Sequence, residues 1–194
     1  MAEALALGRA RLGRTGANPA VGALVVADGK VVGRGATEEG GRPHAEPLAL
    51  AQAGPRSKGA TLYVTLEPCA HHGRAGPCAE AIVAAGIARV VSAMEDPDPR
   101  MRGAGHALLR DAGVAVEIGA GAAEAAYDHR GHVSRVTEGR PLVTLKLART
   151  ADGFAAGPPG ASRLKITGAE AEARVHGLRA THDAILVGGA TALA

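Results

Sequence analysis

The alternation of strand and helix patterns through residue 118 is the feature that most restricts what this chain can fold into. Two apolar runs, 21–26 and 31–33, flank Asp28-Gly29, which is a strong signal for a two-residue hairpin turn. After this hairpin, predicted helices and strands take turns, which indicates an α/β layered sheet with a parallel portion. The expected strands are 60–66, 88–94 and 114–118, and the expected helices are 3–12, 45–53 (beginning at about His44), 78–85 and 104–112.

A domain boundary is predicted near Gly139-Arg140-Pro141, where the pattern restarts. Beyond it the sequence predicts strands at 141–148 and 183–187 and a helix at 168–180. Two strands and one helix are too few to form an independent hydrophobic core. We therefore expect one complete domain at 1–139 and the beginning of a second α/β domain at 140–194.

Charge and aromatic content favour a small anionic substrate over a nucleic acid. The formal net charge is +3, with one Phe, two Tyr and no Trp, whereas nucleic-acid surfaces combine basic clusters with aromatic residues. No uncharged apolar run approaches the ~20 residues of a membrane span, and the N-terminus does not have the pattern of a signal peptide. We expect a cytoplasmic protein without a membrane partner.

The chain has only two cysteines, Cys69 and Cys78. A cytoplasmic location does not favour a structural disulfide between them. Three interpretations remain from the residues alone: inert core positions, a redox pair, or metal ligands.

A zinc site follows if His44 joins the two cysteines, because zinc prefers thiolate and imidazole ligands. Three protein ligands leave a fourth position for water, which is typical of a catalytic site. Bound zinc lowers the pKa of that water from ~15.7 to about 7. Glu46 would face the open position and move a proton from the water to a leaving amine. Zinc deaminases carry the signature H-x-E…P-C-x-x-C, which His44-Ala45-Glu46 and Pro68-Cys69 match.

The spacing of the cysteines departs from that signature, because eight residues instead of two separate them. His71, His72 and Arg74 lie in this insertion. The two histidines are rival zinc ligands, but they follow Cys69 so closely that we prefer them as substrate contacts. The forked guanidinium of Arg74 suits a phosphate. The alternative is a solvated loop whose charges have no function.

These motifs resemble the deaminase domain of the bifunctional riboflavin biosynthesis deaminase/reductase family. The resemblance rests on His44 to Glu46, Thr65 to Cys69, His71 to Arg74 and Pro77-Cys78. Three other groups of residues extend it: Asn18-Pro19, the turn Asp96-Pro97-Asp98-Pro99, and the stretches 142–153 and 182–191, which are similar to the opening of the reductase domain.

For the first domain, the resemblance implies a three-layer cytidine-deaminase-like fold and deamination of 2,5-diamino-6-ribosylamino-4(3H)-pyrimidinone 5′-phosphate. His44, Cys69 and Cys78 would hold zinc, and Glu46 would move the proton. The implied substrate contacts are Asn18, His71, His72, Arg74 and Asp96.

For the second domain, the resemblance implies a dihydrofolate-reductase-like fold that uses NADPH. The implied substrate contacts are Ser162 and Arg179, and the implied cofactor contacts are Lys146, Arg149, Asp152 and Thr191. Because the chain ends at Ala194, the resemblance implies that most of this domain is absent, and we expect no reductase activity. An exposed sheet edge here would allow homo-oligomer formation.

The chain departs from the family pattern at several positions. Thr37 stands where the family often has His, and Asp98 replaces an Asn. The loop after Arg74 reads Ala75-Gly76 in place of Thr-Pro, and Leu164-Lys165 replaces a tryptophan-containing pair.

Two other functions stay open on the sequence. One is a zinc deaminase of a free base, a nucleoside or a tRNA adenosine, although such relatives usually have a short C-x-x-C. The other is a non-catalytic zinc scaffold, against which the presence of Glu46 argues.

Overall fold

A computed structural model describes residues 1–73, 76–158, 160–162 and 164–193 of the chain, with the side chains of 190 and 191 excluded. The chain divides into two compact units, Met1–Leu142 and Val143–Ala194.

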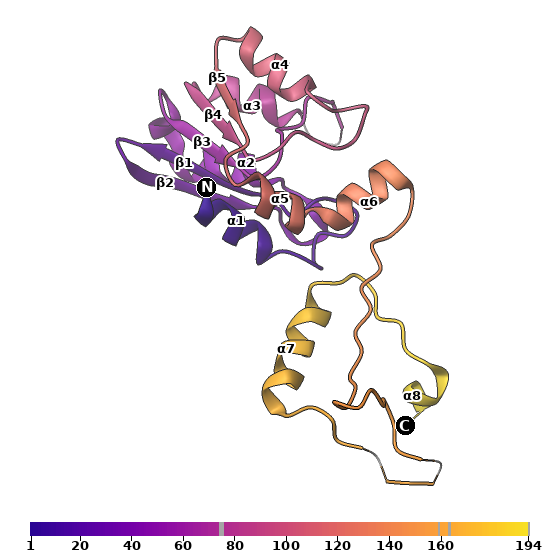
Figure 1. The fold of residues 1–194 in the computed structure, drawn as a ribbon. Helices are drawn as coiled ribbons and strands as arrows, with labels where there is room; N and C mark the ends of the chain where they lie inside the picture. Colours follow the sequence, from indigo (N-terminus) through magenta and orange to yellow (C-terminus); the bar gives the residue numbers. More distant parts are fainter. Residues whose placement is uncertain (74–75, 159, 163, 194) are drawn as a thin grey trace. The chain divides into compact units, whose positions relative to one another are not determined.

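The first unit is built on a five-stranded mixed sheet (Figure 1). β1 pairs antiparallel with both β2 and β3, while β3, β4 and β5 run parallel. The predicted hairpin is confirmed: Ala27 pairs with Lys30, and Asp28 and Gly29 between them have φ values of 49° and 72°. The strands are β1 (Gly22–Ala27), β2 (Lys30–Ala36), β3 (Thr61–Val64), β4 (Arg89–Ser92) and β5 (Ala115–Ile118), in the order β2-β1-β3-β4-β5.

Helices cover both faces of this sheet, which confirms the predicted three-layer α/β fold (Figure 1). α2 (Ala45–Ala53), α3 (Cys78–Ala84) and α4 (Ala104–Asp111) pack on one face. Leu62, Val64 and Val90 of the sheet meet Ala49, Ile82 and Leu109 of these helices in the main core. α1 (Ala2–Arg9) and α5 (Ala122–Asp128) contribute Leu5 and Ala125 to a smaller cluster with Ala93.

Glycines in β2 allow α2 to lie directly against the sheet. A Cβ atom on Gly35 would lie 2.0 Å from the carbonyl oxygen of Ala45, and one on Gly33 would lie 2.0 Å from that of Ala49. Because no side chain separates the two backbones, β2 fixes the position of the first turn of α2. His44 and Glu46 lie at that turn.

Two helices and two short 3-10 segments of this unit had no counterpart in the sequence prediction. α5 is followed by α6 (Arg130–Glu138), and η1 (Glu39–Gly41) and η2 (Gly54–Ser57) flank α2. The predicted helix 3–12 is shorter than expected, since α1 ends at Arg9. The N–H groups of Arg11 and Leu12 bond three residues back, to Gly8 and Arg9, which tightens the chain into a turn.

The second unit has helices α7 (Ala169–Ala180) and α8 (Gly189–Leu193). The predicted strands at 141–148 and 183–187 are wrong, because the described part of the unit forms no strand. A strand needs a neighbour to satisfy its backbone N–H and C=O groups, and neither segment is paired in a ladder. Their apolar side chains are correspondingly open to solvent: Leu145 is 85% exposed and Leu186 is 98% exposed.

Candidate metal centre and substrate cavity

Three side chains from three parts of the sequence meet at one point beside the sheet. His44 immediately precedes α2, Cys69 follows β3, and Cys78 is the first residue of α3. The His44 Nδ1 atom lies 3.7 Å from the Cys69 Sγ and 3.4 Å from the Cys78 Sγ. The ligand atoms of all three residues lie within 4.8 Å of one another, as a shared metal ion requires.

The electrostatics of this cluster favour a thiolate. A hydrogen bond from the Cys78 thiol, together with the neighbouring His44, lowers the pKa of Cys69 to about 4 despite its burial. The backbone N–H of Cys78 also donates to the Cys69 Sγ, at 3.3 Å. The same pairing raises the pKa of Cys78, because only one of the two thiols carries the negative charge. A thiolate beside an imidazole is the donor set that zinc prefers, so these residues fit a zinc ion.

Glu46 lies in the first turn of α2, and only 3% of its surface is exposed. Burial raises the pKa of Glu46 to about 7. Its carboxyl group shares a cavity with His44 and Cys69. A buried carboxyl group beside a metal-binding cluster can exchange protons with a bound molecule.

The cavity has a volume of about 470 Å³. Besides the cluster and Glu46, five parts of the chain contribute to its wall: residues 17–21 with Thr37, the loop at Arg42, residues 66–71, residues 96–101, and α6 through His132 and Arg135. Its mixture of buried apolar surface and convergent polar groups is typical of a small-molecule site.

The structure brings three of the five predicted substrate contacts into this cavity: Asn18, His71 and Asp96. His72 instead lies on the surface, where its Nε2 is 3.1 Å from the carboxylate of Glu80. Arg74 lies outside the described residues.

Thr37, one of the departures from the family pattern, is 1% exposed and has a structural contact. Its hydroxyl accepts a hydrogen bond from the N–H of Val21 at 3.0 Å and donates to the carbonyl of Pro19 at 3.1 Å. The threonine therefore ties the end of β2 to the loop that carries Asn18.

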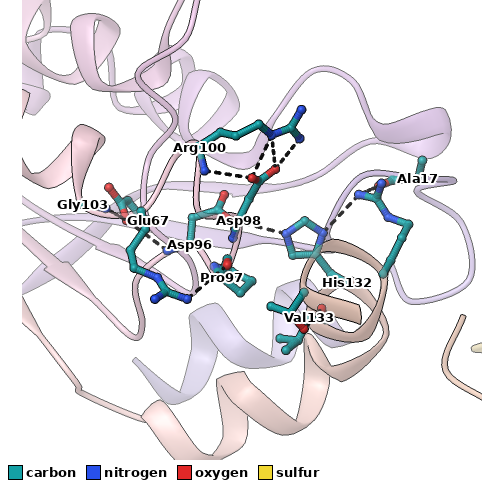
Figure 2. A network of polar contacts seen from close by, with 12 residues as sticks. Ala17, Glu67, Asp96, Pro97, Asp98, Arg100, Gly103, His132 and Val133 are labelled. Atoms are coloured by element: carbon teal, nitrogen blue, oxygen red, sulfur yellow. Dashed lines mark hydrogen bonds and ion pairs between the residues drawn. The ribbon is translucent and has the colours of Figure 1, made fainter. Parts of the chain in front are cut away.

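Several residues near the cavity were missed by the sequence analysis. Glu67 is the clearest case: it accepts backbone hydrogen bonds from Asp96, Gly103, Gly105 and His106 at 2.8 to 3.2 Å. Figure 2 shows Glu67 beside Gly103 and Asp96. The only sequence feature that could have indicated a role for Glu67 was its position directly before Pro68-Cys69.

His132, Arg135, Arg42 and Arg100 also line the cavity without having been predicted. The first two lie on α6, a helix that the sequence analysis left unassigned. Arg100 pairs with Asp98, with its Nε donating at 2.9 Å (Figure 2).

The predicted reductase residues lie in the second unit. Lys146, Arg149, Asp152, Ser162 and Arg179 are all exposed. The side chain of Thr191 is not among those that the structure describes.

Comparisons with known proteins agree with this fold and site. Residues 1–94 match the family model of the cytidine and deoxycytidylate deaminase zinc-binding region, and residues 141–194 match that of the RibD C-terminal domain. The fold and the His/Cys/Cys cluster thus define a chain with a cytidine-deaminase-like zinc-binding domain.

Similar sequences and structures specify the family further. Riboflavin biosynthesis protein RibD of Aquifex aeolicus is 49% identical over 97% of this chain, and that of Escherichia coli is 46% identical over 100%. A deaminase/reductase structure from Thermotoga maritima has a TM-score of 0.91 and 38% identity over all of this chain. RibD of Acinetobacter baumannii has a TM-score of 0.85 and 44% identity over 93%.

The chain belongs to the RibD family of riboflavin biosynthesis proteins. It spans about half the length of these relatives: 52% and 53% of the two sequences, and 55% and 50% of the two structures. The part of the chain that the structure describes has no helix long and apolar enough to cross a membrane.

Proposed function

We propose that residues 1–139 form a zinc-dependent deaminase domain and that 140–194 are the start of a reductase domain. The observation that carries this proposal is the cluster of His44, Cys69 and Cys78, because His44 and Cys69 line the same cavity as the buried carboxyl group of Glu46. A purely structural zinc site has no need for a buried acid at this position.

The reaction replaces an exocyclic amine of a pyrimidine with oxygen, consuming water and releasing ammonia. Zinc held by His44, Cys69 and Cys78 would supply Lewis-acid activation of water at neutral pH. Glu46 takes a proton during the addition of water and returns one to the departing amine, so no net proton is gained or lost. Its burial keeps this transfer away from bulk solvent.

The proposed substrate is 2,5-diamino-6-ribosylamino-4(3H)-pyrimidinone 5′-phosphate. The Thermotoga maritima neighbour is named a diaminohydroxyphosphoribosylaminopyrimidine deaminase, which supports a phosphorylated pyrimidine for this chain. The cavity is compatible in charge, since Arg42 on its wall has no carboxylate within ion-pair distance among the described residues. Asn18, His71 and Asp96 are the proposed contacts within the cavity, with Arg74 as a further contact.

Ammonia release tests the proposal. Zinc-loaded protein is incubated in parallel with the phosphorylated pyrimidine, with its dephosphorylated form and with cytidine. We expect turnover of the phosphorylated compound and little of the other two. Turnover of cytidine alone would instead assign the domain to a nucleoside deaminase, and zinc binding without turnover of any compound would favour a scaffold.

For the second unit, we propose that Ser162 and Arg179 correspond to substrate-binding positions of the family's reductase. Lys146, Arg149, Asp152 and Thr191 are proposed to correspond to its NADPH-binding positions. Support comes from the match of residues 141–194 to the RibD C-terminal domain.

A further inference from the structure

Part of the substrate cavity comes from a segment that neither matched family region contains. The two regions are residues 1–94 and 141–194, so Asp96 and helix α6 lie between them. His132 and Arg135 of α6 nevertheless line the cavity together with Asp96. The zinc-binding region therefore does not account for this side of the cavity.

A chain of polar contacts runs through α6 from one cavity loop to another. The Arg135 Nη2 donates to the carbonyl oxygen of Ala17 at 2.9 Å and lies 3.4 Å from the His132 Nδ1. On the other side of the ring, the His132 Nε2 lies 3.6 Å from the Asp96 Oδ1. Figure 2 shows His132 between Ala17 and Asp96.

The two ring nitrogens of His132 face different partners, Arg135 at Nδ1 and Asp96 at Nε2. With its proton on Nε2, the imidazole accepts from Arg135 at Nδ1 and directs its N–H at the Asp96 carboxylate. The 3.6 Å separation is longer than a hydrogen bond, but this ring nitrogen is buried and has no hydrogen-bond partner among the described residues. Asp96 is the acceptor that it faces.

At the Asp96 end of this network, further hydrogen bonds hold the loop in place. The Asp96 carboxylate accepts the N–H of Asp98 at 2.9 Å, and Asp98 is in turn paired with Arg100. At the Ala17 end of the network, Ala17 directly precedes Asn18, whose N–H donates to the carbonyl oxygen of Thr15 at 3.2 Å. The polar network therefore joins two loops, and each loop carries one of the proposed substrate-binding residues, Asn18 or Asp96.

We propose that His132 and Arg135 are positioning residues of the substrate site, which hold the Ala17-Asn18 loop and the Asp96 turn at a fixed separation. This inference rests on the proposed function, because it takes the cavity as the place where the pyrimidine binds. Neither side chain is assigned a proton transfer. Their effect on the reaction is exerted through Asn18 and Asp96.

Amide exchange measured by NMR tests the structural part without any substrate. In Arg135→Gln and His132→Phe proteins, the N–H groups of Asn18 and Asp98 are expected to exchange at least about fivefold faster than in the unchanged protein, because local opening becomes easier. Amides of β3 serve as an internal reference. Arg130→Gln is the matched control, since Arg130 lies on the same helix but contacts Tyr127 outside the cavity.

Steady-state kinetics on the phosphorylated pyrimidine test the functional part. Because the Arg135 guanidinium donates a charge-assisted hydrogen bond to the loop that carries Asn18, its loss is expected to raise KM about tenfold in Arg135→Gln. The value of kcat and the zinc content are expected to stay close to those of the unchanged protein. Arg135→Lys, which keeps a cation and a donor, should recover part of the loss.

The outcomes separate the two proposals. Unchanged exchange at both Asn18 and Asp98 would overturn the positioning role, whatever the protein's activity. Faster exchange with an unchanged KM would overturn it as well, because the loops would then be loosened without consequence for binding. If the unchanged protein deaminates no pyrimidine, the proposed function itself is refuted.

Discussion

Glu46 is the residue on which the proposed chemistry depends most. The Glu46→Gln substitution keeps the size of the side chain but removes its ability to carry a proton. We expect kcat to fall at least about 100-fold, in line with the usual contribution of general acid–base catalysis. Zinc content, measured in the same protein by atomic absorption, should be unchanged because Glu46 is not one of the three ligands. Normal activity would point to another base.

His129 provides a test at the residue scale that does not involve the metal. It is buried at the junction of α5 and α6, and burial lowers its pKa to about 4, whereas an unfolded chain has a histidine pKa of about 6.5. Between these values the unfolded state binds more protons. The stability associated with neutral His129 is therefore fully present above pH 6.5 and is lost as the pH falls toward 4.

We expect His129→Gln to flatten the dependence of urea stability on pH between about 6.5 and 4. The matched control is His176→Gln, because His176 is exposed on α7 in the second unit. An equally steep pH dependence in the His129→Gln protein would show that other groups cause the acid destabilisation.

At the scale of elements, Glu67 joins the strand-to-cysteine loop to the beginning of α4. Its two carboxylate oxygens accept four backbone N–H groups. Glu67→Gln replaces one oxygen with an NH₂ group that faces two of these donors. Because a buried donor without a partner costs about 1–3 kcal/mol, we expect the free energy of unfolding to fall by about 2 kcal/mol or more. Urea titration measures this free energy of unfolding, and Glu80→Gln on the exposed face of α3 is the control. If the Glu67→Gln protein were as stable as the unchanged protein, the assigned role of Glu67 would be contradicted.

The sequence predicted these elements best where local signals and tertiary packing agree. The Asp28-Gly29 hairpin and the glycine-terminated helices α2 and α3 follow from backbone chemistry. The metal cluster follows from ligand chemistry, because His44-Ala45-Glu46 and Pro68-Cys69 match the deaminase signature although the spacing to Cys78 does not. α6 carried no comparable motif, so His132 and Arg135 could not be connected with Asp96 before the fold was known. The strands predicted at 141–148 and 183–187 failed because apolar periodicity does not specify a pairing partner.

At the scale of the whole molecule, the two units differ in how much they bury. Every buried hydrophobic residue among those described lies at or before Ala125, and α7 has no buried residue. Since burial of apolar surface dominates folding stability, we expect a chain ending at Leu142 to keep the melting temperature and zinc content of the full chain. Differential scanning calorimetry on the two proteins, with zinc quantified in each, provides the comparison. A drop of several degrees in the shorter protein would mean that Val143–Ala194 stabilises the first unit, and the two units would then have to be treated as one cooperative structure.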